Sequence, residues 1–356
     1  MNNEAGFDYK SIITGVVGAL KPMKDYETPF VEECTENRQR ISTGILALDI
    51  ALNGGLSNEL YIMGAETSTG KSAFIMSMAQ HIAMEGTNVL YFSLEMGRSE
   101  FIARGISAIS YESHFKDEKA KLVTAGDILY WTYDYALKKF ARVPYQQYAP
   151  YSSEYFRRYG EHLYILEAGP AGYTVNDIAN IAYFFKKKTE KPVVVFVDYL
   201  QIIKADPEDR SQSDRKTKTD VTVTTLKALA SQIGMPVFAV SSVGRLSYNK
   251  KVSLASMKES GDTEYTGGVM IGWNWKGVTD AKDDEDKDLV KQECMKRGYR
   301  EMELEVLKYR NAQRDNSVNL IYYPAYNYFA GPDEDGFIPI GDEEVPFENT
   351  KRVIIA

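Results

Sequence analysis

The stretch that most constrains the fold is residues 60–72, LYIMGAETSTGKS. Residues 60–63 form a short apolar run with a β-branched member, which predicts a buried strand. Residues 64–70 are small or polar and predict a loop, and Lys71 and Ser72 then open an apolar run with helical periodicity. A strand, a small-residue loop and a helix start in this order predict an anion site, because the loop N–H groups and the positive helix end point the same way.

The residue types in this loop predict binding of a nucleoside triphosphate with Mg²⁺. Lys71 can reach the β- and γ-phosphates, and the Ser72 hydroxyl can ligate the metal. The position usually held by the first glycine is an alanine here, so the motif reads A-x-x-x-x-G-K-S. The alternative is a glycine-rich turn before an ordinary surface lysine. Such a turn rarely has a strand directly before it and a helix directly after it. The residues expected to contact the nucleotide are Ala65, Glu66, Thr67, Ser68, Thr69, Gly70, Lys71 and Ser72.

Length and composition narrow the class of protein. A chain of 356 residues can hold one large α/β domain with appendages or two modest ones. The net charge of −8 argues against a surface that attracts nucleic acid everywhere, although it is compatible with a local basic groove. The two cysteines show no metal spacing, which favours a reducing, cytoplasmic setting. No apolar run reaches membrane-spanning length, so we expect a soluble protein with no membrane partner.

The first forty residues have a different character from the rest. Five apolar residues fall on one face at helical spacing and predict a helix, namely Ile12, Ile13, Val16, Val17 and Leu20. Residues 23–40 are polar and predict a linker. The apolar face needs a cover, which is either the protein's own domain or a neighbouring subunit. We therefore predict three parts: a helix and linker (1–40), a main domain (41–332) and a tail (333–356).

Strands and helices alternate through the main domain, which predicts a doubly wound, mostly parallel α/β sheet. Residues 204–219 are polar and predict a mobile segment, and the acidic run 280–288 predicts a solvated loop. The tyrosine-rich residues 111–158 predict helices with an irregular excursion that either stacks bases, binds a partner or packs as a small extra layer. The later strands are expected at residues 88–93, 162–166, 193–197, 236–241, 267–273, 301–308 and 318–323.

Two carboxylates follow strands of this sheet. Asp198 closes the apolar run VVVFV, and Glu95 stands just past the strand at residues 88–93. Ligands of such sheets bind outside the carboxyl ends of the strands, where the phosphate loop also lies. Asp198 is therefore expected to hold Mg²⁺, and Glu95 to act as the general base on the attacking water. The alternative for an acidic residue at a strand end is a helix cap or turn residue.

Several motifs, in order, resemble one family. Ser42-Thr43-Gly44 with Leu48-Asp49, FSLEM at 92–96 and DYLQ at 198–201 are similar to the ATPase domain of DnaB-like replicative helicases. KESG at 258–261 and KYRN at 308–311 continue the resemblance, which covers residues 40–330. The family implies a RecA-like fold and a homohexameric motor that uses ATP and moves on single-stranded DNA.

The resemblance also implies residue roles. Glu95 matches the family's catalytic glutamate and Asp198 its magnesium aspartate. Lys308 and Arg310 match the cations that one subunit presents to its neighbour's ATP, with Arg310 as the arginine finger; without the resemblance they read as a solvated strand end. The residues that match the DNA-channel loop are Lys258, Glu259 and Gly261.

The sequence departs from the family in two places. Ser242 stands where the family usually has a glutamine that senses the γ-phosphate, which puts the coupling of hydrolysis to DNA movement in question. Only about forty residues precede the motor, so we expect no trimeric collar and no primase contact. The expected function is an ATP-dependent DNA helicase or translocase. The alternatives are a recombinase-like or regulatory ATPase without unwinding, and a non-catalytic scaffold in which Glu95 is dispensable.

Overall fold

The computed structural model describes residues 17–18, 20–28, 30–31, 40–134, 138–207, 215–258, 268–309 and 317–331. The chain divides into two compact units, residues 1–39 and residues 40–356, which are described separately. In the first unit, a short 3₁₀ helix, η1, spans Met23–Tyr26. Of the predicted apolar stripe, Val17 is 60% exposed and Leu20 is 71% exposed. The rest of that stripe and the predicted tail lie outside the described residues.

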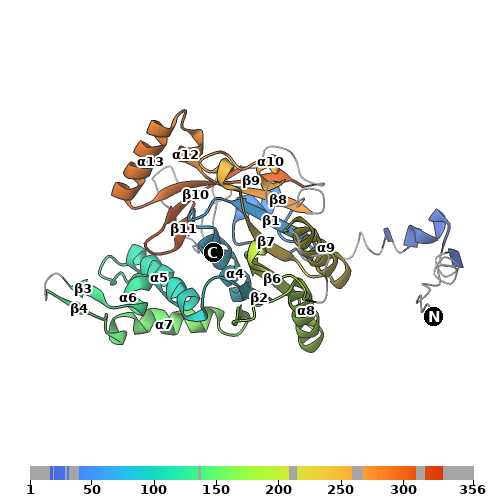
Figure 1. Cartoon of the computed structure of the whole chain (residues 1–356). Helices are drawn as coiled ribbons and strands as arrows, with labels where there is room; N and C mark the ends of the chain where they lie inside the picture. Colours follow the sequence, from blue (N-terminus) through green and yellow to red (C-terminus); the bar gives the residue numbers. More distant parts are fainter. Residues whose placement is uncertain are drawn as a thin grey trace, which may run out of the picture. The chain divides into compact units, whose positions relative to one another are not determined.

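The second unit is built on one sheet, which has nine strands within its described residues, in the order β11-β10-β9-β8-β1-β7-β6-β2-β5 (Figure 1). The strands from β8 through β5 in this order pair in parallel, and β9, β10 and β11 extend the sheet in antiparallel pairing. The prediction of a mostly parallel sheet is confirmed. The strands are β1 (Leu60–Ala65), β2 (Asn88–Ser93), β5 (Leu163–Glu167), β6 (Val193–Asp198), β7 (Val237–Ser242), β8 (Val269–Trp275), β9 (Arg300–Lys308), β10 (Ser317–Tyr323) and β11 (Tyr328–Ala330).

Helices cover both faces of this sheet. Successive side chains of a strand point to opposite faces, so each central strand contributes to two cores. Tyr61 and Met63 of β1 pack in the core shared with α4, whereas Leu60 and Ile62 pack in the core shared with α8 and α9. The helices are α3 (Leu46–Ala51), α4 (Lys71–Met84), α5 (Arg98–Lys116), α6 (Ala125–Leu129), α7 (Tyr145–Tyr159), α8 (Val175–Thr189), α9 (Arg215–Ile233), α10 (Leu254–Lys258), α12 (Lys276–Asp280) and α13 (Asp284–Arg297).

The acidic run 280–288, predicted as a loop, belongs largely to a helix. α13 begins at Asp284, and the Asp283 side chain accepts a hydrogen bond from the backbone N–H of Asp286 at 2.9 Å. Three acidic residues lie in the first turn and two basic residues in the last. This distribution complements the helix dipole, which the sequence interpretation overlooked. The loop prediction was wrong because charge alone does not separate a solvated loop from an exposed helix.

Two other boundaries differ from the prediction. α9 begins at Arg215, so the polar segment 204–219 ends in helix, while residues 208–214 lie outside the described part of the chain. β1 runs on to Ala65, so Gly64 and Ala65 are strand residues and not loop residues. Strand pairing decides the second point, because Gly64 and Ala65 pair in register with Ser241 and Ser242 of β7.

The tyrosine-rich segment forms helices α6 and α7 and a small hairpin of β3 (Thr132–Asp134) and β4 (Lys139–Ala141). Tyr155 of α7 is 3% exposed and packs with Ile106 and Ile109 of α5 in a separate small core. This core supports the interpretation of an extra packing layer. Among the described residues, no helix combines the length and the apolar character needed to cross a bilayer.

Candidate functional site

The phosphate loop is held by its own backbone and by two side chains from the antiparallel end of the sheet. The Thr69 hydroxyl donates to the Glu66 carbonyl at 2.8 Å, which closes the loop on itself. Trp273 Nε1 donates to the Thr69 carbonyl at 3.1 Å, and Arg300 Nη1 donates to the Ser68 carbonyl at 2.8 Å. Three of the loop's carbonyls are thus hydrogen-bonded within the protein.

Gly70 caps the start of α4 in a conformation that other residues adopt at a cost. Its φ is +91°, in the left-handed region. A Cβ at this position would lie 2.5 Å from Cε1 of Tyr322, a distance that real Cβ atoms do not reach. Within the described residues no side chain caps this helix start, so the first N–H groups of the helix stay open to an anion.

A cavity of about 390 Å³ opens at this helix start. Residues of the phosphate loop and both predicted carboxylates line this cavity, although Lys71, Glu95 and Asp198 are far apart in the sequence. Its size is ordinary for a small-molecule site. The lining residues are Thr67, Ser68, Gly70, Lys71, Ser72, Ala73, Glu95, Met96, Glu100, Arg104, Asp198, Tyr199, Ser242 and Tyr322. Three predicted nucleotide contacts, Ala65, Glu66 and Thr69, are not in this lining.

Asp198 is almost fully buried, with 2% of its surface exposed. The Tyr91 hydroxyl donates to its Oδ2 at 3.1 Å, whereas Oδ1 has no hydrogen-bond partner among the described residues. Burial raises the pKa of this carboxyl, and the charge of Glu95 adds to the rise. Hydrogen bonds from Ser72 and Tyr91 and the charge of Lys71 lower the same pKa. A buried carboxylate oxygen without a partner calls for a cation or a proton.

The donor set fits Mg²⁺. The unpartnered Oδ1 of Asp198 and the Ser72 hydroxyl are hard oxygen donors that line the same cavity. The described residues contain no group of three or more His, Cys, Asp or Glu that could hold a metal by themselves. Mg²⁺ suits such a site, because it commonly takes one or two protein oxygens and completes its shell with water and substrate phosphate.

Lys71 and Glu95 bring opposite charges to the cavity. Lys71 is 7% exposed, and its Nζ lies 5.5 Å from the centroid of the Tyr199 ring. Glu95 is exposed and follows β2, whose neighbour β6 ends at Asp198. The backbone N–H of Leu94 donates to the Asp198 carbonyl at 2.9 Å, which fixes the start of the Glu95 turn beside Asp198.

Arg104 and Tyr322 are cavity residues that sequence reasoning missed. Arg104 lies on α5 and pairs with Glu100 one turn earlier, with its Nη2 2.6 Å from Glu100 Oε1. Arg104 is therefore a second cation in the cavity lining, which the sequence interpretation did not foresee. The i,i+4 spacing of Glu100 and Arg104 directly after Glu95 was a usable signal. Nothing in the sequence near Tyr322 pointed to the phosphate loop.

Ser242 reaches the cavity while its backbone is held by Gln201. The Gln201 amide donates from Nε2 to the Ser242 carbonyl at 3.1 Å and to Ser241 Oγ at 3.0 Å. Its Oε1 accepts from the Ser242 N–H at 3.2 Å. The DYLQ glutamine thus fixes the end of β7, and the Ser242 hydroxyl is left beside the nucleotide cavity.

The other predicted residues lie away from this cavity or outside the description. Lys308 is the last residue of β9 and is not among the described residues that line the cavity. Lys258 ends α10, and its side chain is not described. Glu259, Gly261 and Arg310 lie outside the described residues.

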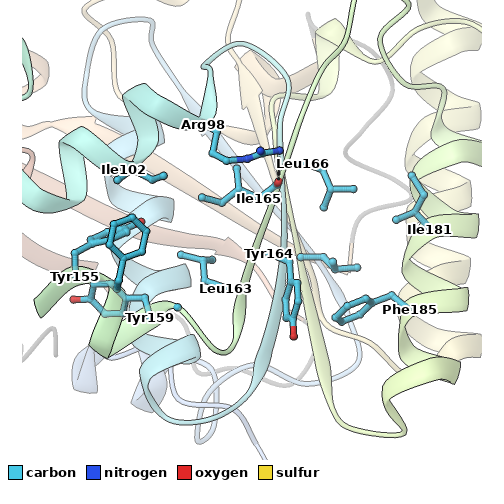
Figure 2. A pocket seen from close by; sticks show the side chains of 13 residues that line it. Arg98, Ile102, Tyr155, Tyr159, Leu163, Tyr164, Ile165, Leu166, Ile181 and Phe185 are labelled. Carbon is cyan, nitrogen blue, oxygen red and sulfur yellow. Dashed lines mark hydrogen bonds between the residues drawn. The ribbon is translucent and has the colours of Figure 1, made fainter. Parts of the chain in front are cut away.

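A second cavity, of about 480 Å³, lies along β5 at the sheet edge and is largely apolar. Figure 2 shows Leu163 and Tyr164 of β5 between the α7 side chains Tyr155 and Tyr159 and the α8 side chain Phe185. The Arg98 guanidinium approaches Glu167 to 3.9 Å at one end. Apart from Arg98, the described lining of this cavity is aromatic and aliphatic and includes no carboxylate, so the candidate active site is the phosphate-loop cavity.

Fold and site together define a phosphate-loop protein of the RecA-like, doubly wound type. Residues 40–331 match the model of the DnaB-like helicase C terminal domain, so the chain belongs to the DnaB-like helicase family. This confirms the family suggested by the motifs FSLEM and DYLQ.

Curated relatives support this membership. The chain is 29% identical over 232 residues to replicative DNA helicase DnaB of Treponema pallidum (strain Nichols), covering 65% of this chain and 47% of the relative. It is 24% identical over 322 residues to replicative DNA helicase DnaB of Geobacillus stearothermophilus, covering 88% and 62%. The chain therefore spans roughly half to three-fifths of these relatives.

Solved structures show the same fold. One, described as a DnaB-like replicative helicase and its interactions with primase, superposes with a TM-score of 0.64 at 21% identity, covering 90% of this chain and 70% of that one. A second, described as an ATPase domain, superposes with a TM-score of 0.63 at 21% identity, covering 91% and 98%. The prediction of a RecA-like fold is confirmed.

We expect Asp198→Asn to lower ATP turnover and to raise the melting temperature of the nucleotide-free protein. The amide is a poor magnesium ligand, so ATP turnover should fall at least about a hundredfold. Because burial raises the carboxyl pKa, the folded state disfavours the charged form. Below the unfolded-state pKa the carboxyl is protonated in both states and costs the fold nothing. As the pH rises through the folded-state pKa, the buried carboxyl ionises and the free energy of unfolding of wild type falls. The nucleotide-free variant should therefore melt at a higher temperature than wild type at pH 7.

Melting curves across pH check this expectation. The gap in melting temperature between variant and wild type should close as the pH falls toward about 4, the unfolded-state pKa of aspartate. Asp280→Asn, at an exposed position, is the matched control and should change neither quantity. A lower melting temperature for Asp198→Asn at pH 7 would contradict the electrostatic argument.

Proposed function

We propose that this chain is an ATP-hydrolysing motor that moves on single-stranded DNA and works as a ring, a homohexamer. The observation that carries the proposal is the cavity in which the phosphate loop, Lys71 and Glu95 meet the unpartnered Oδ1 of Asp198. Membership of the DnaB-like helicase family supports DNA as the track. The relatives' printed names, replicative DNA helicase, support unwinding as the task.

In this proposal each cavity residue has one task. Lys71 and the open N–H groups of α4 bind the β- and γ-phosphates of ATP. Ser72 and Asp198 hold Mg²⁺, which neutralises phosphate charge when it is bound. Glu95 accepts the proton of the attacking water, since it lines the cavity and is exposed to solvent. Arg104 adds a second local cation beside the transferring phosphate.

Subunits are proposed to complete one another's sites. Lys308 is the last residue of β9, and Arg310 follows it two positions later in the sequence. An arginine matches the charge that spreads over the transferred phosphate. Because Lys308 does not line the cavity within the described part of its own chain, a neighbour's ATP is its proposed target.

The N-terminal unit is proposed to help these subunits meet. Val17 and Leu20 leave most of their surface exposed. Apolar side chains on a tethered helix need a cover. Residues 23–40, which include η1 and are predicted from the sequence as a linker, are enough chain to reach another protomer. The DNA path is proposed to run by the residues Lys258, Glu259 and Gly261.

A second candidate function is an ATPase that binds DNA without unwinding it, as a recombinase-like or regulatory module. Ser242 favours this candidate, because its hydroxyl has a shorter reach than the glutamine that the family usually has at this position. Two assays separate the candidates. Strand separation on forked DNA supports the helicase, whereas DNA-stimulated ATP hydrolysis without strand separation supports the second candidate. Mass measurements with and without single-stranded DNA test the ring.

We expect Glu95→Gln to keep ATP binding and to slow hydrolysis about 10²- to 10⁴-fold, because an amide does not accept the proton of the attacking water. Binding of a fluorescent ATP analogue and steady-state phosphate release give the two quantities. Glu118→Gln, at an exposed position, serves as the control. Unchanged turnover in Glu95→Gln would mean that this residue is dispensable and would favour a scaffold that binds nucleotide without using it.

A further inference from the structure

The chain that follows β7 runs beside the phosphate loop. β7 pairs with β1, and the backbone N–H of Val243 donates to the Ala65 carbonyl at 3.0 Å. Residues 243–253 then lead into α10, which ends at Lys258. The segment therefore connects the nucleotide cavity directly to the first residue of the proposed DNA path.

Two hydrogen bonds join this segment to the phosphate loop, and one packing contact joins it to β1. The Thr67 hydroxyl donates to the Tyr248 hydroxyl at 3.1 Å, and the backbone N–H of Asn249 donates to Glu66 Oε2 at 2.7 Å. Met257 of α10 is fully buried against Gly64, where a Cβ would come within 2.9 Å of its Cγ and Sδ. Glu66 does not line the cavity; its side chain instead holds the backbone of the segment after β7.

The other side of the segment is fixed on the sheet. Lys251 Nζ lies 3.1 Å from Glu303 Oε2 and 3.2 Å from Glu305 Oε2, both on β9. The Val252 N–H donates to Asn274 Oδ1 on β8 at 2.7 Å. With these anchors on β8 and β9, the phosphate loop is the element that can change its hold on the segment when a ligand arrives.

Thr67 supplies the physical basis for such a change. It lines the nucleotide cavity, and its hydroxyl carries a single proton, which it donates to Tyr248. A phosphate oxygen in the cavity competes for that proton, because a charged acceptor makes the stronger hydrogen bond. Nucleotide binding therefore alters the contact between Thr67 and Tyr248.

We infer that Tyr248 is a positioning residue that couples occupancy of the nucleotide cavity to DNA affinity. The segment 245–258 carries the effect from Thr67 to Lys258. The inference rests on the proposed function, since it requires that the residues after Lys258 bind DNA. It also offers a coupling route that does not need the glutamine replaced by Ser242.

The test compares DNA affinity with and without nucleotide. Fluorescein-labelled oligo-dT is titrated with wild type and with Tyr248→Phe, first alone and then with AMP-PNP and Mg²⁺. The coupling factor is the ratio of the two dissociation constants. Tyr248→Phe removes only the hydroxyl, so the melting temperature should stay at the wild-type value. Oligo-dT affinity without nucleotide should shift toward the value that wild type shows with AMP-PNP, because the contact with Thr67 is already absent. The coupling factor should move toward one by about two- to tenfold.

Tyr183→Phe is the matched control, because Tyr183 is a half-exposed tyrosine on α8, outside this segment. By reciprocity, the affinity for AMP-PNP should show the same change when oligo-dT is present, which a general loss of structure would not produce. A wild-type coupling factor that Tyr248→Phe leaves unchanged overturns this inference alone. A wild-type protein without any nucleotide effect on oligo-dT binding overturns both the inference and the proposed function.

Discussion

Lys71→Ala should abolish measurable ATP turnover, a loss of at least about a hundredfold, because the β- and γ-phosphates lose the cation that the phosphate loop supplies. Lys71 is 7% exposed, so its ammonium is poorly screened by solvent and acts strongly on a bound phosphate. The remaining Arg104 pairs with Glu100 and cannot take its place at the loop. Steady-state phosphate release and binding of a fluorescent ATP analogue measure the two consequences.

The matched control is Lys188→Ala, which removes an exposed lysine from α8 and should leave both measurements unchanged. Lys71→Arg tests geometry, since it keeps the charge but brings a planar fork in place of a compact ammonium. We expect it to recover only a small part of the activity. Normal hydrolysis by a correctly folded Lys71→Ala protein would exclude this cavity as the ATPase site.

The second large effect concerns Arg310. Arg310→Ala should reduce turnover about 10³- to 10⁵-fold if it serves as an arginine finger, since it then stabilises charge only in the transition state. Mixing supplies the sharper measurement. Arg310→Ala and Lys71→Ala protomers are each expected to be inactive alone. In mixed rings, an intact Lys71 site can meet an intact Arg310 from its neighbour.

The recovery has an expected size. With random assembly at equal amounts, about a quarter of the interfaces in a cyclic ring combine an intact site with an intact finger. Activity should therefore rise toward that fraction of wild type. Mixing Arg310→Ala with the double variant Lys71→Ala, Arg310→Ala supplies no intact finger and should recover nothing. Normal turnover by dilute, monomeric Arg310→Ala would show a site complete within one chain and would remove the argument for a ring.

The sequence was enough to predict the class of fold and the family, and it pointed to the loop before Lys71 and to Asp198, which the fold brings into one cavity. Each of these rests on local patterns: the apolar run before Asp198, the small residues before Lys71, and the alternation of strands with helices. Such patterns predict helices and strands because the spacing of apolar residues along the chain decides which side chains share a buried face. The acidic helix α13 shows the limit of that approach, since its charges suit both a loop and a helix.

Only the tertiary structure decided which distant residues serve the site. The sheet order places β1 between β7 and β8, so Thr67 meets Tyr248 across 181 positions and Trp273 reaches Thr69 across 204. The unpartnered Oδ1 of Asp198 is likewise a fact of packing, because it depends on what surrounds the end of β6. Order along the chain specifies the elements, whereas strand pairing selects their neighbours through contacts between residues far apart in the sequence.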